Sequence, residues 1–503
     1  MKNLVICCDG TWNTSDQHDN GVPDPTNVVR LYNAIAEVDT LGVSQYKYYH
    51  PGVGTSGSRW DKAIAGGTGK GLDRNIMSAY RDLCDHYERG DRIYLFGFSR
   101  GAYTVRSVAG LVSCCGLLDI QGLKETDAWQ RIEQLFQRGY RRKSERREAW
   151  EVQGWKFQND ADKKVPIRFV GVWDTVGALG IPDDMALLNL IDNLHDYTFH
   201  DTQLSATVQT ARHAIAMDEM RASFQPTLWT GSHPDAEQRW FSGVHADVGG
   251  GYPEIGLSDG PLKWMIDEAG HCDLAFNPSI VKQIQPNPRG VLHDSCQGAF
   301  ALLPMQPRSV PQLGVDKSID VSALNRQLDP PIHQCPYRQA RPFSQPTPLT
   351  LDIFAAQQWN ATGVWLEAGR TYRFTAAGEW LDSSIKCGPG GADDGHFQLS
   401  EVAQMAGSML GQIEELFTKI TDNKSAQFRF TKRHEDMPWF CLVGTIANGG
   451  GADAKGYIEP HESFRIGDGC NYNPRKSGYF YAYANDAWNC YGNNRGRVTL
   501  TIK

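Results

Sequence analysis

Five residues, Gly97-Phe98-Ser99-Arg100-Gly101, have the types and spacing of a serine nucleophile held on a tight turn. The run before them, residues 93–96, is apolar and rich in β-forming residues, and from Tyr103 onward apolar residues recur at helical spacing. The two glycines allow a strand and a helix to pass close together, which lifts the serine above the edge of a sheet. Backbone N–H groups at the start of a helix favour a negatively charged oxygen. The stretch therefore predicts acyl-transfer chemistry at Ser99.

A serine hydroxyl becomes a nucleophile when a base removes its proton, and the base needs a carboxylate to orient it. Asp174 and His245 each follow a predicted strand, at residues 165–173 and 239–244, and come after Ser99 in the order serine, acid, histidine. The glycine run after His245 would let the backbone approach the site closely. Other candidate acids and bases are Asp9, Asp183, Asp201, Asp247, His50, His213 and His271. We expect Asp174 to be the acid and His245 the base, with Asp247 as the alternative acid because it is two residues from His245.

An oxyanion formed at Ser99 needs N–H donors from two places in the chain. One is the Arg100 N–H directly after the nucleophile, and the other is an N–H in a loop after an early strand. The predicted strand at residues 4–8 ends in Asp9-Gly10-Thr11, so Gly10 and Thr11 are the candidates for the second donor.

Length and composition limit the number of domains and the class of protein. At 503 residues the chain is expected to form two or three domains, and 41% hydrophobic and 21% charged residues are typical of a globular protein. A net charge of −8 gives no overall attraction to nucleic acid, and no apolar run is long enough to span a bilayer. The N-terminus does not resemble a signal peptide, so we expect synthesis in the cytoplasm without one. The twelve cysteines form no C-x-x-C pair, although a disulfide among Cys387, Cys441, Cys470 and Cys490 stays open.

Strands and helices alternate over roughly the first 270 residues, which predicts an α/β fold with a doubly wound, mostly parallel sheet. Residues 207–224 are expected to be one of the packing helices, with a polar stripe. We assign residues 1–276 to a catalytic domain, 277–348 to a proline-rich cover or linker, and 349–503 to a β-sandwich with a helical insertion at 399–422. The glycine-rich loop at 66–71 lacks the spacing of a phosphate-binding loop.

The basic run at 138–147 is expected to be a solvated helix face, and it is the place to look for contact with lipid headgroups.

Four separated segments carry a family resemblance: Asp9-Gly10-Thr11-Trp12-Asn13, Gly97 to Ala102, Val172-Trp173-Asp174-Thr175-Val176, and Gly243 to Tyr252. Together they resemble the α/β-hydrolase family that contains phospholipase effectors of bacterial type VI secretion. The resemblance covers about the first 260 residues. It implies hydrolysis of phospholipid acyl esters by Ser99, His245 and Asp174, and export by a type VI-like route.

A second resemblance lies near the C-terminus. Residues 485–496 include Asp486, Asn493 and Asn494, whose side-chain oxygens, with the backbone carbonyl of Cys490, suit calcium. This stretch is similar to the calcium loop of the PA-I-type galactose-specific lectin, in which calcium coordinates sugar hydroxyls. The same resemblance places His396 and Gln398 near sugar-contacting positions. A turn-rich hairpin that holds no ion is the alternative.

The leading hypothesis is a serine lipase or phospholipase that a calcium-dependent, galactose-like glycan-binding sandwich holds at a membrane or glycan surface, without spanning the membrane. One alternative is a carboxylesterase for acylated sugars or polysaccharides. The other is a glycan-binding protein without catalytic activity.

Overall fold

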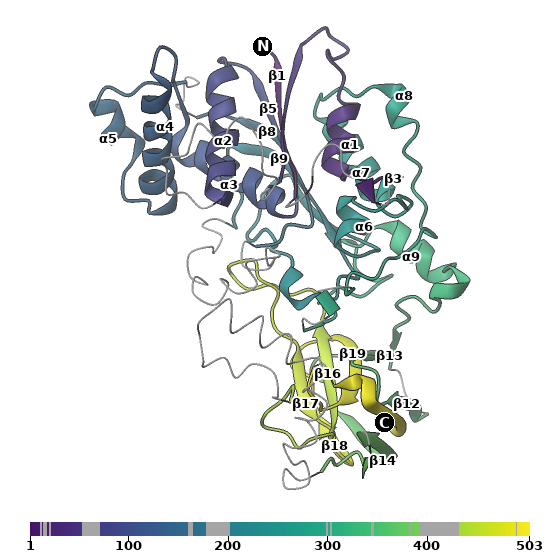
Figure 1. Ribbon diagram of the computed structural model, residues 1–503. Coiled ribbons are helices and arrows are strands. Elements are labelled where there is room, and N and C mark those ends of the chain that lie inside the picture. Colours follow the sequence, from purple (N-terminus) through teal and green to yellow (C-terminus); the bar gives the residue numbers. More distant parts are fainter. Residues whose placement is uncertain are drawn as a thin grey trace.

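The computed structural model describes residues 1–10, 13, 18–19, 22–52, 71–158, 164–177, 202–297, 300–301, 304–343, 347–382, 384–392, 432–488 and 490–503. Within these residues the chain forms an α/β unit followed by a unit of antiparallel sheets (Figure 1). The expected helical insertion at 399–422 and residues 66–70 of the glycine-rich loop lie outside the described residues.

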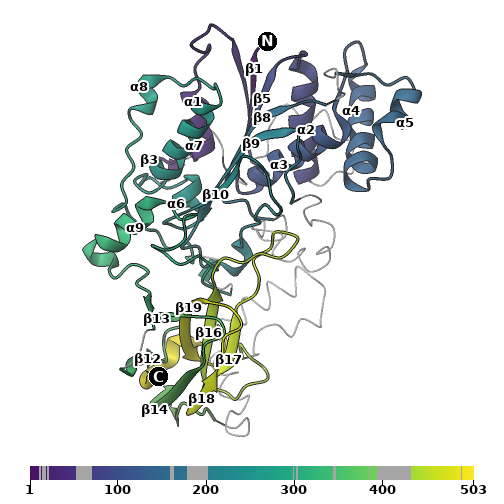
Figure 2. The same cartoon turned by 180° about the vertical axis from the view of Figure 1, so that it is seen from behind.

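The α/β unit is built on six parallel strands in the order β10-β9-β8-β5-β1-β4, which confirms the predicted fold class. Both faces of the interior strand β1 are covered: Leu4 and Ile6 pack with α2 and α3, whereas Val5 and Cys7 pack with α1 and α7. The two views in Figures 1 and 2 show these helix pairs on opposite sides of the sheet. The strands are β1 (Asn3–Cys8), β4 (Gln45–His50), β5 (Arg92–Phe98), β8 (Ile167–Trp173), β9 (Val208–Ala216) and β10 (Ala236–Phe241).

The remaining elements of this unit are short or lie at its margins. Helix α6 follows β10 directly, and the consecutive helices α4, η1 and α5 lie together at one side of the sheet (Figure 1). The helices are α1 (Asn27–Ala34), α2 (Gly71–His86), α3 (Arg100–Cys115), α4 (Glu125–Gln134), η1 (Leu135–Arg141), α5 (Arg147–Val152), η2 (Ala222–Phe224), α6 (His245–Gly249), α7 (Asp259–His271), α8 (Pro278–Val281), α9 (Val321–Leu328) and η4 (Ile332–Gln334). The short strands are β2 (His18–Asp19), β3 (Val22–Pro23), β6 (Leu117–Leu118) and β7 (Phe157–Gln158).

One predicted element is wrong. Residues 207–224, expected to be a helix, instead contain strand β9, which pairs in parallel with β8 and β10, and then a loop with the short helix η2. Strand β9 lies inside the sheet and is buried on both faces, so its polar residues, such as His213, are satisfied internally instead of forming a solvated stripe. A pattern of polar and apolar residues over such a short stretch does not separate a helix from an interior strand.

We call the turn at residues 97–101, which carries Ser99, the elbow, and the strand order explains where it lies. The chain leaves β1 toward β4 on one side and returns to β5 on the other, so the winding direction reverses between β1 and β5. In open parallel sheets, ligands bind beyond the carboxyl ends of the strands at such a reversal. Gly10 follows β1 and Ser99 follows β5, which places both at this point.

The second unit has two sheets, antiparallel except for the parallel pair β11–β13, whose facing residues form one apolar core. Along β20, Val498, Leu500 and Ile502 alternate toward that core, the pattern of a strand with one buried face. The first sheet has the order β11-β13-β19-β16-β17, and the second β12-β20-β14-β15, with β18 beside β14. Their bounds are β11 (Arg341–Pro342), β12 (Leu349–Phe354), β13 (Asn360–Leu366), β14 (Tyr372–Asp382), β15 (Ile385–Cys387), β16 (Leu442–Asn448), β17 (Glu462–Arg465), β18 (Gly469–Tyr472), β19 (Gly478–Ala484) and β20 (Asn494–Ile502), with helix η5 (Tyr491–Asn493) before β20. We call this unit the sandwich domain.

Two further expectations can be compared with the structure. All twelve cysteines are free, so the open question of a disulfide among Cys387, Cys441, Cys470 and Cys490 is answered by four separate thiols. Among the described residues, none of the helices combines the length and the apolarity that a bilayer crossing requires.

The glycines of the elbow are packed against backbone. A Cβ added to Gly101 would lie 2.1 Å from the carbonyl oxygen of Cys8, so α3 and β1 touch at this position. A Cβ added to Gly97 would lie 2.4 Å from the carbonyl oxygen of Gly101, so β5 and α3 touch as well. These contacts fix the distance between the sheet and the helix that carries the elbow.

We predict that Gly101→Ala destabilises the protein although alanine is the better helix former. The helix preference favours alanine by about 1 kcal/mol, whereas the clash with the Cys8 carbonyl is expected to cost more than about 3 kcal/mol. Gly270→Ala in α7 is the matched control, because nothing lies within 4 Å of its added Cβ. Thermal melting checks both variants. A Gly101→Ala midpoint equal to the wild-type midpoint would contradict the close packing.

Candidate active site

Ser99 occupies the turn between β5 and α3 in a strained conformation. Its φ of 56° and ψ of −121° lie in a region that residues with a side chain rarely adopt. The conformation is held from both sides, since the Ser99 N–H donates to the Trp173 carbonyl at 3.1 Å and the Ser99 carbonyl accepts from the Tyr103 N–H at 3.2 Å. The side chain makes no capping hydrogen bond to α3. The elbow predicted from the sequence thus has the strained turn that such a nucleophile requires.

The loop after β1 lies against the elbow. A Cβ added to Gly10 would lie 3.3 Å from the Cβ of Ser99, so the absence of a side chain at Gly10 leaves room beside Ser99. The Gly10 N–H donates to Oδ1 of Asp9 at 2.7 Å, and Oδ2 of Asp9 accepts from the hydroxyls of Thr26 and Tyr49. Burial raises the pKa of Asp9 to about 6, although these hydrogen bonds oppose the rise. Asp9 therefore orders this loop.

The expected oxyanion donors have different surroundings. Arg100 is the first residue of α3, where backbone N–H groups have no partner within the helix. The Gly10 N–H is engaged by its neighbouring carboxylate, as described above. Thr11 lies outside the described residues.

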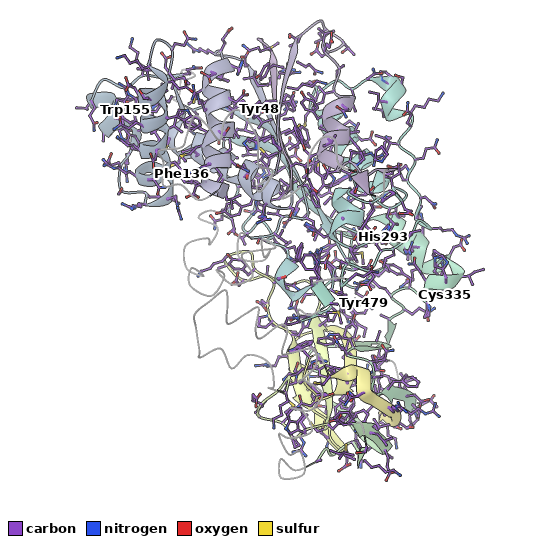
Figure 3. The ribbon with its side chains drawn as sticks, viewed as in Figure 1. Tyr48, Phe136, Trp155, His293, Cys335 and Tyr479 are labelled. Atoms are coloured by element: carbon purple, nitrogen blue, oxygen red, sulfur yellow. The ribbon has the colours of Figure 1, made fainter. Side chains whose placement is uncertain are left out.

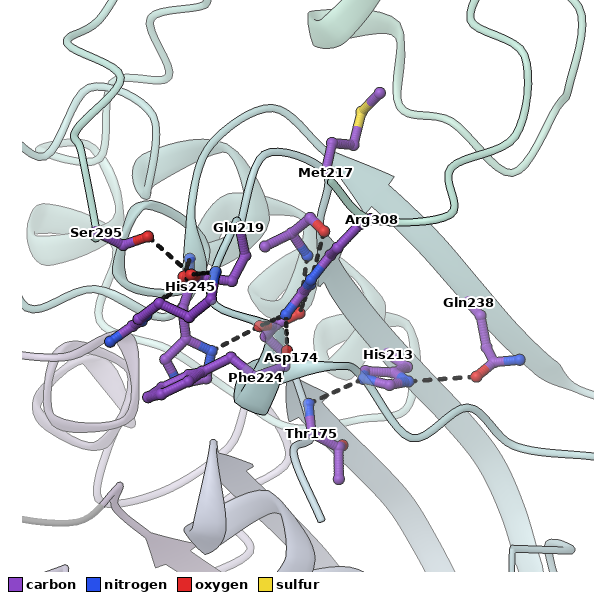
Figure 4. A network of polar contacts seen from close by, with 12 residues as sticks. Asp174, Thr175, His213, Met217, Glu219, Phe224, Gln238, His245, Ser295 and Arg308 are labelled. Carbon is purple, nitrogen blue, oxygen red and sulfur yellow. Dashed lines mark hydrogen bonds and ion pairs between the residues drawn. The ribbon is translucent and has the colours of Figure 1, made fainter. Parts of the chain in front are cut away.

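Asp174 and His245 meet beyond the carboxyl ends of β8 and β10. The distance between His245 Nδ1 and Asp174 Oδ2 is 2.6 Å, and both side chains are buried (Figure 4). Asp174 has a φ of 38°, and its backbone N–H donates to the Ala214 carbonyl at 2.7 Å, which turns the carboxylate back over the end of β9. The contact leaves Nε2 of His245 as the nitrogen that can accept a proton, because Nδ1 donates to the carboxylate.

A residue that the sequence analysis missed completes the environment of Asp174. Arg308 forms a bidentate ion pair with this carboxylate, from Nη1 to Oδ1 at 2.6 Å and from Nη2 to Oδ2 at 2.9 Å, and its side chain is fully buried (Figure 4). Burial by itself would raise the pKa of Asp174, but the charge of Arg308 and the hydrogen bonds from His245 and Arg308 outweigh it and hold the pKa well below its usual range. Asp174 is therefore ionised at neutral pH.

His245 is enclosed by aromatic rings and by a second carboxylate. The rings of Phe98 and Phe224 lie with their centroids 4.6 and 5.1 Å from the imidazole. The His245 backbone N–H donates to Oε2 of Glu219 at 3.1 Å. Burial lowers the pKa of His245, although the hydrogen bond to Asp174 opposes this change. The imidazole is therefore held neutral, the state of a general base.

Glu219 was expected on the polar stripe of a helix, but it is a buried anchor in the loop after β9. Its carboxylate accepts from the Arg221 guanidinium at 2.9 Å, from Ser295 Oγ at 2.7 Å, and from His245 as above. Burial tends to raise the pKa of Glu219, but the hydrogen bonds and charge of Arg221 prevail and lower it to about 2. Glu219 thus stays ionised and fixes the start of α6.

The alternative acids and bases have other partners. Oδ1 of Asp247 contacts His293 Nδ1 at 2.6 Å, and its Oδ2 accepts from the Val244 N–H. His213 Nε2 accepts from the Thr175 N–H at 3.1 Å, and burial lowers its pKa to about 3, so it is a neutral support for the loop that carries Asp174. His50 contacts its own neighbour Pro51, and His271 is the exposed last residue of α7. Asp183 and Asp201 lie outside the described residues.

The second predicted site lies in the loop between β19 and β20. Asp486 is buried, and its Oδ2 accepts from Asn494 Nδ2 at 2.8 Å. Asn493 Nδ2 donates to Oδ1 of Asp382 at 2.7 Å, and Asp382 pairs with Asn494 across strands β14 and β20. The Oδ1 atoms of Asn493 and Asn494 are buried without a hydrogen-bond partner, which is unusual for a native structure. Burial, with a contribution from the charge of Asp382, raises the pKa of Asp486 to about 7.

These oxygens fit a calcium ion, because an ion bound there would satisfy two orphaned amide oxygens and offset two carboxylates. Cys490 lies in the same loop, and its N–H donates to the Ala487 carbonyl at 3.0 Å. Asp382 was not predicted; it comes from β14, far away in the sequence. Among the described residues, no cluster of three or more His, Cys, Asp or Glu side chains has the arrangement of a metal site, so a site here depends on amide and carbonyl oxygens. His396 and Gln398 lie outside the described residues.

The basic run is partly neutralised by neighbours. Arg138 pairs with Glu145 at 3.1 Å, Arg141 with Asp73 at 2.9 Å, and Arg147 with Glu151 at 2.9 Å. Arg142, Lys143 and Arg146 are exposed.

The chain is similar to a curated protein, to several solved structures and to one family model. A curated protein of Saccharomyces cerevisiae, described as uncharacterized protein YEL023C, is 33% identical over 245 residues, which are 46% of this chain and 33% of that protein. The chain therefore spans a third of that relative's length. Three solved structures are similar at low identity: an uncharacterized protein from Pseudomonas aeruginosa (18% identity, TM-score 0.31, covering 57% of this chain and 49% of that one), the Tle1 effector bound to the VgrG spike of the type VI secretion system (18%, 0.29, 51% and 52%), and the N-terminal domain of EclA, a PllA-like lectin (13%, 0.18, 30% and 92%).

A family model matches residues 2–268, more than half of the chain, which span all six strands of the parallel sheet and the residues Ser99, Asp174 and His245. The model describes the catalytic domain of Tle1-like phospholipase effectors of the type VI secretion system. This chain belongs to that family.

Proposed function

We propose that the protein hydrolyses acyl esters of phospholipids or related lipids with Ser99 as nucleophile, His245 as general base and Asp174 as the acid that orients it. The observation that carries this proposal is the buried contact of 2.6 Å between His245 Nδ1 and Asp174 Oδ2, together with the strained Ser99. Membership of a phospholipase effector family favours a lipid ester over other acyl substrates.

The reaction follows from the positions of the protons. With Nδ1–H donated to Asp174, Nε2 of His245 accepts the hydroxyl proton while Ser99 Oγ attacks the ester carbonyl carbon. The negative charge that forms on the carbonyl oxygen is stabilised by the Arg100 N–H and by the N-terminal end of α3. Collapse of this intermediate releases the alcohol, which takes the proton from His245. Water then attacks the acyl-serine through the same steps and releases the fatty acid.

The sandwich domain is proposed to bind calcium and, through it, a galactose-like glycan. Asp486, Asn493, Asn494 and the Cys490 carbonyl would hold the ion, with Asp382 as an additional carboxylate beside it. The support is the pair of buried amide oxygens without partners. Bound calcium would supply coordination positions for sugar hydroxyls. Such a domain would keep the enzyme near glycan-bearing lipid and raise the local concentration of ester. Export by a type VI-like route is proposed on the family alone.

We predict that Ser99→Ala lowers ester hydrolysis by a factor on the order of 10³ or more, because the nucleophile is lost. The assay measures fatty acid released from phospholipid vesicles and the cleavage of soluble p-nitrophenyl esters. Ser113→Ala, farther along α3, is the control and is expected to retain activity. Cleavage of soluble esters without fatty acid release from vesicles would favour the carboxylesterase for acylated sugars. Failure of the wild type to cleave any ester would favour a glycan-binding protein without catalysis.

In the pH profile of kcat/KM, we expect the fall on the acidic side, the acid limb, to be centred below about pH 6.5, the usual pKa of histidine. Burial lowers the pKa of His245, and the base is active only when it is neutral, so activity is retained until the pH falls through this lowered value. Rates measured on a soluble ester between pH 4.5 and 8 test the prediction. A limb centred above pH 7 would contradict it.

Calcium is expected to raise the melting temperature of the protein, because the ion binds the folded loop and not the unfolded chain. At a concentration of 100 times the Kd, the stabilisation would be about 2.7 kcal/mol. Asp486→Ala should abolish the shift. Asp352→Ala, which removes an Asp paired with Arg497 on the surface of the same domain, should retain it. Equal midpoints with calcium and with EGTA would argue for a hairpin that holds no ion, and retention on galactose resin with and without EGTA tests the glycan separately.

A further inference from the structure

The segment that carries Arg308 lies between the two domains. Residues 304–313, which we call the strap, run from the loop after β9 to the surface of the sandwich domain. On the α/β side, the Ala222 N–H donates to the Pro304 carbonyl at 3.1 Å and the Gln306 N–H donates to the Met220 carbonyl at 2.6 Å. The strap therefore pairs with the loop that also supplies Glu219 and Phe224 to the surroundings of His245.

The opposite side of the strap is held by the sandwich domain. Trp359 Nε1 donates to the Met305 carbonyl at 2.9 Å, and His461 Nε2 lies 2.6 Å from the Pro307 carbonyl. The Leu313 N–H donates to the Tyr479 hydroxyl at 3.1 Å, and Figure 3 shows Tyr479 at the junction of the two units. Two backbone carbonyls just before Arg308 thus accept hydrogen bonds from side chains of the sandwich domain, and a backbone N–H after it donates to a third such side chain.

Apolar packing closes the same junction. Ile215 and Met217 at the end of β9 share one buried cluster with Val310 of the strap and with Trp365 and Tyr479 of the sandwich domain. Ala216, the last residue of β9 and the one between Ile215 and Met217, donates its N–H to Oδ1 of Asp174 at 2.9 Å. The position of the catalytic acid is therefore tied to a core that contains residues of both domains.

We propose that Arg308 is a positioning residue for Asp174 and that the sandwich domain, through Trp359 and His461, holds Arg308 in place. The inference rests on the proposed role of Asp174 as the acid of the reaction. It makes the sandwich domain part of the structure that sets the catalytic acid, in addition to any role in binding a surface.

The contacts of Arg308 explain why the strap must be held. Besides Asp174, its guanidinium donates to the carbonyls of Ala216 at 2.7 Å and Phe224 at 2.5 Å. Four hydrogen bonds from one planar group require the backbone of the strap to stay at one distance from β9. Without the hydrogen bond from Trp359, the strap would no longer keep the guanidinium of Arg308 aligned with both carboxylate oxygens of Asp174. Asp174 would then orient His245 less well.

The first test is Trp359→Phe, which keeps a ring against Tyr483 but removes the hydrogen bond to Met305. We expect kcat on a soluble ester to fall about fivefold with KM unchanged. Trp380→Phe is the matched control: it makes the same substitution in the core of the sandwich domain, and we expect wild-type kcat. Equal kcat for Trp359→Phe and the wild type, or an equal loss in both variants, would overturn the proposal.

The second test substitutes Arg308 itself. Arg308→Lys keeps the positive charge but loses the paired N–H donors that bind both oxygens of Asp174. We therefore expect kcat to fall at least tenfold, with the acid limb of the pH profile near its wild-type position. Arg308→Gln also removes a positive charge near His245, which should raise the pKa of this histidine and move the acid limb to higher pH. A pH profile for Arg308→Gln that matches the wild-type profile would show that Arg308 only supports the fold.

A third measurement does not depend on activity. Hydrogen exchange of the amides at residues 214–217 reports whether Asp174 still accepts from Ala216. Exchange there should be faster in Trp359→Phe than in Trp380→Phe and the wild type. If the wild type cleaves no ester, the proposed function fails, and this comparison still decides whether the sandwich domain holds the strap: equal exchange in all three proteins would refute it.

Discussion

The ion pair between Arg308 and Asp174 is the interaction on which the rest of the site depends. A carboxylate with no exposed surface is costly to bury alone, and losing one partner of such a pair typically costs 3–5 kcal/mol. Here the cost is offset by a bidentate guanidinium, a backbone N–H and an imidazole, so that both oxygens of Asp174 have partners. The orientation of His245 follows from this arrangement.

The elbow and the acid are stabilised by different means. Ser99 is held by the close backbone packing of α3 on β1 and β5, which the glycines make possible, and by hydrogen bonds to the backbone of Trp173 and Tyr103. Asp174 and His245 are held by side chains that come from β9, from the loop after it and from the strap. The turn at Ser99 thus depends on glycine spacing that can be read in the sequence, whereas Asp174 and His245 depend on side chains from segments far apart in the sequence.

This difference explains what could be predicted from the sequence. The elbow, the parallel sheet and the antiparallel second unit were predictable because each has a local signature in spacing, glycine placement or alternation. Strand β9 was misread as a helix because an interior strand with polar residues has no distinctive period. Arg308 could not be found, since it lies in a proline-rich stretch without periodicity and its partner is 134 positions away. Gly10 lies beside Ser99, and its N–H donates to Asp9, a contact that only the folded loop reveals.

The strap also has a consequence for the order of events during synthesis. The parallel sheet, the elbow and both members of the Asp174–His245 pair leave the ribosome before Arg308, and the side chains that hold the strap, Trp359 and His461, leave later still. Domains that fold as units during translation do so from the N-terminus onward. A nascent chain that ends before residue 308 would contain Ser99, Asp174 and His245, yet Asp174 would lack the guanidinium of Arg308. The proposed site would then be complete only after the strap and its supports, Trp359 and His461, have been synthesised.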